Sequence, residues 1–245
     1  MEHPQSREAF SLVMNELRKS GIQTFHAVGN HELYNFSWEE MRNLYNDEQN
    51  TIAKDHFYFS FQPIQGWTCI MLNPYEVSIM QKEDSWGYKE AYNILKDKNK
   101  NFATQGTANF FEGLEGLEQR FVPFNGGFGT KQTAWLEQTL NEVKEQGGRV
   151  VIFTHTPLFD AAASVKNLAF DYDHVLKIIH SAGNVELVMA GHYHRGGYAQ
   201  DEQGVHHVTI QSPLTHGYCF GVVEVFLSKI ECKGIGKQRS YSFQI

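Results

Sequence analysis

The sequence of 245 residues has no cluster of basic residues: 21 Lys and Arg are outnumbered by 28 Asp and Glu, which gives a net charge of −7. Binding to nucleic acid needs concentrated positive charge, so we expect no nucleic-acid partner. No apolar run approaches the length of a membrane span, and the polar segment Met1–Gln5 does not resemble a signal peptide. We therefore expect no association with membranes.

Cysteine is also scarce. The three cysteines are Cys69, Cys219 and Cys232, an odd number without the spacing of a metal site. A hairpin with its turn near Ser228 would place Cys232 opposite Glu224 and not opposite Cys219, so no disulfide is expected. Reduced thiols are typical of a cytoplasmic protein, and we expect that location.

The hydrophobic pattern predicts one α/β domain over residues 1–245, with a partly antiparallel sheet. Helices are expected over 7–20, 88–98 and 131–146, the last capped by Thr130, and after Asp171 as far as Gly183. Strands are expected over 24–28, 57–61, 67–72, 150–153, 185–190 and 207–210, and in a hairpin over 218–234. Residues 74–124 lack a clear pattern, and we interpret them as an insertion or lid.

Three short motifs stand where apolar runs end. They are Gly29-Asn30-His31-Glu32, Thr154-His155-Thr156-Pro157 and Gly191-His192-Tyr193-His194. The carboxyl ends of strands form the edge where α/β proteins build their sites. Imidazoles and an amide oxygen fixed by the backbone there are suitable ligands for divalent cations that activate water or a phosphoryl group.

Each motif alone has a simpler interpretation. His155 alone is most often a hydrogen-bonded loop histidine, and Gly29–Glu32 alone is compatible with the first turn of a helix. Gly191–His194 alone is evenly balanced between a metal site and a loop. The occurrence of all three in this order indicates a metal-dependent phosphoesterase site.

The motif set resembles the calcineurin-like metallophosphoesterase superfamily and, over most of the chain, the manganese-dependent ADP-ribose/CDP-alcohol diphosphatases. The matching stretches are His56–Phe61, Glu112–Leu114, Gln119–Phe121, Phe124–Phe128, Gly191–His194 and Gly196–Tyr198. The resemblance implies a sandwich of two mixed sheets flanked by helices, with a dinuclear Mn²⁺ site for which Mg²⁺ and Zn²⁺ are alternatives. It also implies a monomer that hydrolyses the diphosphate bond of ADP-ribose, CDP-choline and related small molecules.

The resemblance also assigns roles to single residues. Asn30, His155 and His192 match ligands of one metal, and His194 matches a ligand of the other. His31 matches the catalytic histidine that faces the phosphate. Phe128 and Leu114 match walls of the nucleobase pocket, although plain core packing is the alternative for both, and the favoured one for Leu114.

Two motifs of the superfamily are missing. The sequence contains no Asp-x-His and no Gly-Asp pair, and the string Asp171-Tyr172-Asp173-His174 has the wrong spacing. We therefore expect the fold to lack its first strand–helix–strand segment and the activity to be impaired by the loss of carboxylate ligands. The alternatives are a catalytically inactive nucleotide- or metal-binding fragment or isoform, and another metallophosphoesterase such as a cyclic nucleotide phosphodiesterase. Val28 stands where protein phosphatases of the superfamily carry Arg, which disfavours that class.

Overall fold

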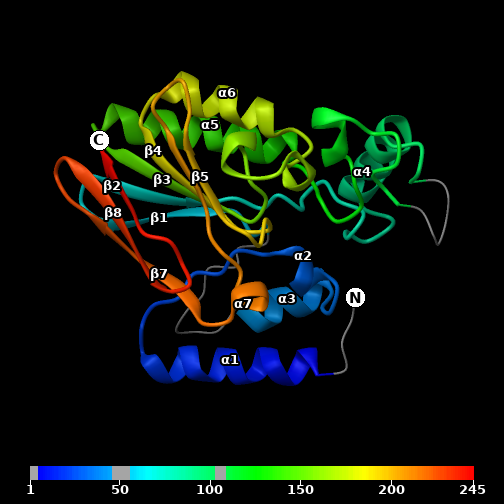
Figure 1. Cartoon of the computed structure of the whole chain (residues 1–245), viewed down its shortest axis with the longest axis horizontal. Helices are drawn as coiled ribbons and strands as arrows, with labels where there is room; N and C mark the ends of the chain where they lie inside the picture. The colour runs from blue at the N-terminus through cyan, green and yellow to red at the C-terminus, as the bar shows by residue number, and fades with distance from the viewer. Residues whose placement is uncertain (1–4, 46–55, 103–108) are drawn as a thin grey trace.

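The computed structural model describes residues 5–45, 56–102 and 109–245, which form two sheets and several helices (Figure 1). The larger sheet has six strands in the order β1-β2-β3-β4-β6-β5. Its four inner strands β2, β3, β4 and β6 are parallel, while β1 and β5 run antiparallel at the edges. The smaller sheet is antiparallel, in the order β7-β8-β9. The predicted α/β class with a partly antiparallel sheet is therefore confirmed.

The helices and strands are numbered in the order in which they occur along the chain. The α-helices are α1 (Ser6–Ser20), α2 (Asn30–Leu33), α3 (Trp38–Tyr45), α4 (Trp86–Lys98), α5 (Thr130–Glu145), α6 (Tyr172–Ala182) and α7 (Pro213–His216). The 3₁₀ turns are η1 (Gly116–Arg120), η2 (Asp160–Ala162) and η3 (Val165–Asn167). The strands are β1 (Phe59–Ile64), β2 (Trp67–Met71), β3 (Arg149–Thr154), β4 (Val185–Ala190), β5 (Gly197–Gln200), β6 (His206–Thr209), β7 (Cys219–Val225), β8 (Lys229–Gly236) and β9 (Tyr241–Gln244).

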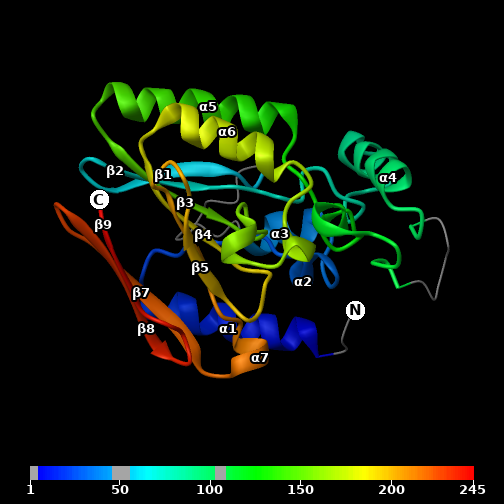
Figure 2. The ribbon, with the colours of Figure 1, turned by 45° about the horizontal axis from the view of Figure 1, so that its top comes forward.

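The six-stranded sheet is covered on both faces. Helices α5 and α6 lie side by side on one face (Figure 2), where Ile152 and Val188 of the sheet pack against Leu140 and Ile179 of the helices. On the other face, sheet residues pack against Ile230, Cys232 and Phe243 of β8 and β9. Because the central strands β3 and β4 are covered on both faces, their sequences are mostly apolar.

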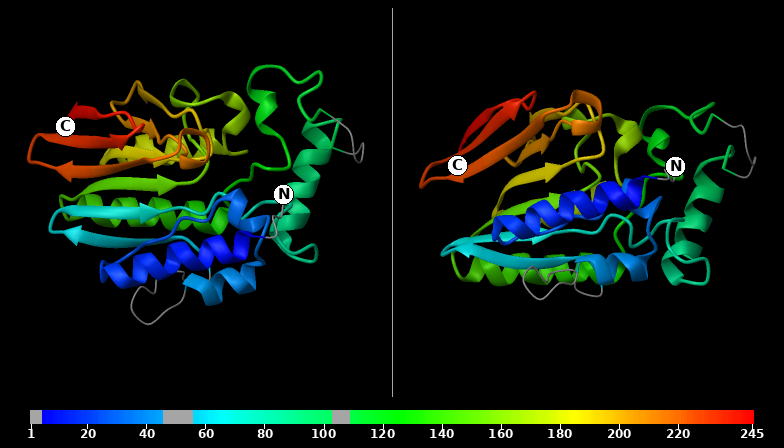
Figure 3. Two further views of the ribbon diagram at one scale, coloured as in Figure 1. Left: turned by 60° about the horizontal axis from the view of Figure 1, so that its bottom comes forward. Right: turned by 90° about the horizontal axis from the view of Figure 1, so that it is seen from below.

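Helices α1, α2 and α3 form a separate group with its own small core (Figures 1 and 3). Gly21 ends α1 in the left-handed conformation, with φ 65°, as predicted. The strand predicted over 24–28 is wrong, because residues 22–29 belong to no ladder in the described chain. The apolar pattern there reflects stacking of side chains: the rings of Phe25 and Phe61 lie 3.6 Å apart, nearly parallel.

The other predicted elements occur within a few residues of their expected ends. The cap of α5 is Gly129 and not Thr130, which is already the first helical residue. Asp171 does stand at the start of α6, but its side chain makes no cap hydrogen bond to that helix. Gly183 ends α6 with φ 66°, as predicted.

The C-terminal hairpin is present, but its register differs by one residue from the prediction. Cys232 lies opposite Val223, and Glu224 lies opposite Glu231. A shift by one residue reverses the faces of every side chain in a strand, so turn position alone was a poor guide. All three cysteines are free thiols, as predicted.

The described residues of the segment 74–124 carry α4 and η1 and lie beside the layered body in Figure 1. Residues 103–108 of this segment, and residues 1–4 of the polar segment Met1–Gln5, lie outside the described residues. Among the residues that are described, no helix combines the length and apolar character needed to cross a bilayer.

A buried carboxylate joins α6 to the β5–β6 hairpin. The Oδ2 of Asp201 lies 2.8 Å from Nε2 of His180 and 2.9 Å from Nε2 of His207. Its Oδ1 accepts from the backbone N–H groups of Gln203 and Val205, each at 3.0 Å. The side chain of Asp201 is only 3% exposed, so these bonds are made in a nearly water-free place.

Replacing Asp201 with alanine is expected to lower the free energy of unfolding by about 3 kcal/mol, because four donors lose a charged acceptor. Burial by itself raises the pKa of Asp201, but hydrogen bonds from His207, His180 and Val205 outweigh it and the pKa is lowered. The contribution is therefore present above the unfolded value of about pH 4 and is lost as the pH falls further. Urea unfolding measures the loss, with the exposed Glu202→Ala as the control; equal losses in both variants would contradict the role of Asp201.

Candidate metal centre

Two adjacent parallel strands bring His155 and His192 together. Thr154 of β3 pairs with Ala190 of β4, and His155 and Gly191 follow directly on each strand. The backbone N–H of Gly191 donates to the oxygen of His155 at 3.0 Å, which holds the two exits side by side. The imidazole rings of His155 and His192 are 5.1 Å apart.

Asn30, the first residue of α2, faces both rings. Its Oδ1 lies 2.9 Å from Nε2 of His155 and 3.2 Å from Nδ1 of His192. Its Nδ2 donates to the hydroxyl of Tyr34 at 3.0 Å, so the oxygen is turned toward the histidines. Gly29 lacks room for a side chain, since a Cβ would lie 2.6 Å from the His155 ring. The structure therefore brings together the three side chains that were assigned to one metal.

The side-chain amide of Asn125 sets the tautomer of His192. Its Nδ2 donates to the backbone oxygens of Arg120 and Lys166, both at 2.8 Å, so its Oδ1 faces Nε2 of His192, 2.7 Å away. An amide oxygen only accepts, so Nε2 carries the proton and Nδ1 of the neutral ring is a bare acceptor. That nitrogen faces the Oδ1 of Asn30, which is also an acceptor. The Nδ1 of His192 and the Oδ1 of Asn30 are therefore two lone-pair donors 3.2 Å apart with no proton between them, which suits them to bind a cation together.

Both rings are held in the neutral form. Burial, followed by repulsion from His192, His31 and His194, lowers the pKa of His155 well below its ordinary value. Burial, with repulsion from His194 and His31, lowers the pKa of His192 to about 3. Neutral imidazoles are the form that binds metal.

The lowered pKa of His192 makes stability depend on pH. Since the unfolded chain binds a proton at this histidine below about pH 6.5, His192 by itself is expected to lower the free energy of unfolding by about 1.4 kcal/mol per pH unit as the pH falls from about 6 to 4. Urea unfolding of the metal-free protein across this range measures the slope. His192→Gln should have a shallower slope than the wild type, and identical slopes would contradict a neutral buried imidazole.

The second pair of histidines, His31 and His194, lies farther apart than His155 and His192. The rings of His31 and His194 are 5.9 Å apart, and Nδ1 of His194 lies 3.0 Å from the hydroxyl of Thr215 on α7. Burial, with repulsion from His31 and His216, lowers the pKa of His194. His31 is exposed, which suits a group that meets a substrate.

The donors fit one cation in number and kind, but not in charge. Asn30, His155 and His192 are all neutral, and the second position has only His194. Within residues 5–45, 56–102 and 109–245, no three or more His, Cys, Asp or Glu side chains are grouped to hold a metal. Among the described residues, the donors that converge here are therefore an amide and imidazoles, and not a group of the carboxylates that divalent cations bind strongly.

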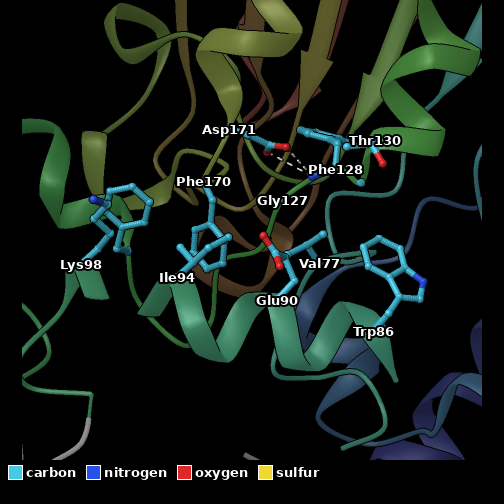
Figure 4. Close-up of a pocket in the computed structure, with 12 residues that line it drawn as sticks. Val77, Trp86, Glu90, Ile94, Lys98, Gly127, Phe128, Thr130, Phe170 and Asp171 are labelled. Atoms are coloured by element: carbon cyan, nitrogen blue, oxygen red, sulfur yellow. Dashed lines mark hydrogen bonds between the residues drawn. The ribbon is translucent and has the colours of Figure 1, made fainter. Parts of the chain in front are cut away.

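A cavity of about 540 Å³ is lined in part by Gly127 and Phe128, which follow Asn125 closely in the sequence (Figure 4). None of the predicted metal ligands lines this cavity. Phe128 is one of its wall residues and is 1% exposed, because it also packs in the core beneath α5 and α6. Leu114 is buried, with 7% exposed, and does not line the cavity. The nucleobase roles of both residues stay predictions.

Sequence reasoning missed Asn125 as a residue of this site. It lies in the stretch Phe124–Phe128, which was noticed only as part of a family resemblance. Its amide is completely buried and makes three polar contacts. An Asn followed by two glycines was the available signal, since such a loop permits close backbone approach: a Cβ on Gly126 would lie 2.3 Å from the oxygen of Pro74.

The layered fold and the donors at the ends of β3 and β4 define a metallophosphoesterase type of domain. A family model described as calcineurin-like phosphoesterase matches residues 3–196. The chain belongs to the calcineurin-like phosphoesterase family, a family of hydrolases.

Named relatives narrow the comparison. Proteins named manganese-dependent ADP-ribose/CDP-alcohol diphosphatase from Arabidopsis thaliana and Homo sapiens are 31% and 30% identical to the chain. The alignments cover 98% and 96% of this chain, and 76% and 72% of the relatives. A crystal structure of a dimetal phosphatase from Danio rerio superposes with a TM-score of 0.89 at 30% identity, covering 98% of this chain and 77% of that one. The predicted family and fold are confirmed.

Proposed function

We propose that the chain carries the amide and imidazole ligands of a manganese-dependent diphosphatase that cleaves the diphosphate bond of ADP-ribose, CDP-choline and related compounds. The observation that supports it best is the convergence of Asn30, His155 and His192, with a bare Nδ1 on His192. The relatives' shared name supplies the metal and the substrate class. A cytoplasmic monomer acting on a small molecule is part of the same proposal.

In this proposal each residue has a distinct task. Asn30, His155 and His192 would hold one Mn²⁺, and His194 would contribute to a second; when bound, such ions polarise a phosphoryl oxygen and lower the pKa of bound water. Asn125 keeps the Nε2 proton of His192 in place, as an outer acceptor that orients a ligand. His31, which is exposed near His194, would donate a hydrogen bond or a proton to a phosphate oxygen.

The same proposal includes a limit on activity. Three neutral ligands bind a divalent cation weakly, so the 245 residues alone are expected to hydrolyse substrate poorly until carboxylate ligands are supplied. This donor chemistry also favours a second candidate function, nucleotide binding without hydrolysis. The cavity lined by Phe128 does not depend on the metal ligands and supports that candidate.

Hydrolysis assays with and without added carboxylates test the proposal. The purified chain, and the same chain fused to the N-terminal segment of a relative, would be incubated with Mn²⁺ and ADP-ribose or CDP-choline. Chromatography would measure AMP and CMP. We expect strong activity only in the fusion. Equal activity in the two proteins would refute the expected impairment. If both proteins bind nucleotide and neither hydrolyses it, the second candidate function, nucleotide binding without hydrolysis, would be favoured.

A further inference from the structure

Strand β7 is an edge of the smaller sheet, where it pairs only with β8 among the described residues (Figure 1). At the two ends of this ladder, the N–H of Phe226 donates to the oxygen of Lys229, and the N–H of Lys237 donates to the oxygen of Tyr218. In an antiparallel ladder, residues that bond to the neighbouring strand alternate with residues that do not. Tyr218 and Phe226 bond toward β8, so the odd-numbered residues between them turn their backbone groups to the open edge. These edge residues are Cys219, Gly221, Val223 and Val225.

The side chains of β7 are apolar and exposed on both faces of the strand. Phe220 and Val222 on one face are 48% and 44% exposed, and Val223 on the other face is 37% exposed. Val223 lies opposite Cys232, which packs in the core with the larger sheet, so its face is the inner one. Edge strands are usually protected by charges, proline or a covering segment, and an unprotected apolar edge is a template for another strand.

A cleft of about 180 Å³ lies between β7 and the larger sheet. Phe153, Met189 and Val208 pair across β3, β4 and β6, and this row forms one wall of the cleft. Two residues earlier on the same face, Val151 and Leu187 are 4% and 0% exposed, whereas Phe153 and Met189 are only half-buried. The smaller sheet therefore covers the carboxyl ends of β3 and β4 less completely than their middles.

The cleft adjoins the candidate metal centre. His155 stands two residues beyond Phe153, a rise of about 7 Å along a strand. The hydroxyl of Thr215 on α7 lies 3.0 Å from Nδ1 of His194, and β7 begins soon after α7, at Cys219 (Figure 1). Strand β7 thus starts near the centre and runs away from it. A strand that pairs antiparallel with β7 would run toward the centre and end beside it.

We propose that the edge of β7 and the cleft behind it accept one added β-strand from a partner polypeptide, antiparallel to β7 and followed directly by carboxylates. Backbone hydrogen bonds to the edge residues would hold the strand, and alternate apolar side chains would fill the cleft. Carboxylates are the matching charge at its end, because Asn30, His155 and His192 are neutral donors for a cation. This last part rests on the proposed function, whereas the contact with β7 does not depend on it.

Titration calorimetry of the full chain in EDTA, with synthetic peptides, tests the added strand. The probe peptide alternates Val and Thr over the length of β7 and ends in Asp-Ala-Asp. Two further peptides carry N-methyl groups on one or the other set of alternate residues, which removes one row of backbone donors and keeps the side chains. Only one of these rows can face β7.

The protein variant for this test is Val223→Pro. The N–H of Val223 faces the open edge, so proline removes an edge donor without removing a bond to β8. Leu227→Pro is the matched control, because Leu227 is 97% exposed and lies in the turn between β7 and β8, where proline is well tolerated. Circular dichroism would verify that both variants are folded.

We expect the probe peptide to bind the wild type and Leu227→Pro equally, and Val223→Pro at least about tenfold more weakly. One N-methylated peptide should lose at least as much affinity, and the other should lose little. No binding to the folded wild type, or equal binding of all three peptides, would overturn the proposal. Sedimentation that shows a dimer of the wild type, converted to monomers by Val223→Pro, would assign the edge to a second copy and also overturn it.

Mn²⁺ titration separates this inference from the proposed function. The probe peptide should tighten Mn²⁺ binding by the chain at least about tenfold, and the same peptide with Ala in place of both Asp should bind without that gain. Peptide binding with no gain from either peptide would overturn the placement of the carboxylates. Peptide binding together with an inactive fusion protein would refute the proposed function and leave the added strand, whereas an active fusion protein without peptide binding would do the reverse.

Discussion

Replacing His155 with alanine is expected to reduce Mn²⁺-dependent hydrolysis of ADP-ribose at least about 1,000-fold in the fusion protein described above. The ring of His155 contacts Asn30 and lies 5.1 Å from that of His192, so its removal leaves two of the three proposed neutral ligands. His192→Ala is expected to have the same effect. Release of AMP, measured by chromatography at saturating Mn²⁺, gives the loss.

The control separates a lost ligand from a damaged fold. His56 is exposed, and its ring stacks on that of Tyr58 with the ring centroids 5.5 Å apart. His56→Ala should therefore keep its activity within about twofold, since surface changes have small effects. Circular dichroism and urea unfolding would verify that the His155 variant is folded. Full activity in a folded His155→Ala would contradict the metal assignment.

Phe128→Ala is expected to lower the free energy of unfolding by about 3–5 kcal/mol. Phe128 is 1% exposed and packs in the core with Leu136 and Ile179, so alanine leaves a cavity beneath α5 and α6. Its position at the wall of the 540 Å³ cavity would connect that void to solvent. Urea unfolding monitored by circular dichroism measures the loss.

A matched phenylalanine shows the effect of burial. Phe220 on β7 is 48% exposed, and Phe220→Ala should change the unfolding free energy by about 0.5 kcal/mol or less. A loss below about 1 kcal/mol in Phe128→Ala would mean that the ring is not a core residue. A second variant, Phe128→Leu, keeps most of the volume; a higher KM for ADP-ribose in that folded variant would support the predicted base-contacting role.

The proximity of His155 and His192 was predictable because neighbouring parallel strands end at one edge of a sheet. The apolar sequences of β3 and β4 indicated such strands, and each histidine follows its strand directly. The strand predicted over 24–28 was wrong for the converse reason. An apolar pattern shows only that a segment can form a strand, whereas a ladder needs a partner strand, and the described chain provides none there.

Asn125 and Asp171 could not be assigned a role from the sequence. The amide of Asn125 is oriented by the backbone oxygens of Arg120 and Lys166, five and 41 residues away. Asp171 looked like a helix cap, yet its carboxylate accepts from Phe128, 43 residues away. Contacts of this kind depend on how loops are placed by the finished fold; the two glycines after Asn125 indicate a closely packed loop but not its partners.

The backbone of His192 has φ 63°, a left-handed conformation that costs a side-chain-bearing residue about 1–2 kcal/mol. Glycine would adopt it without strain, but it would remove the ring that links Asn30 to Asn125. The same substitution would leave the buried Oδ1 of Asn125 without its donor, at a cost of about 1–3 kcal/mol. The strain at position 192 is therefore offset within the site itself, and engineering the chain for thermal stability gains little from glycine there.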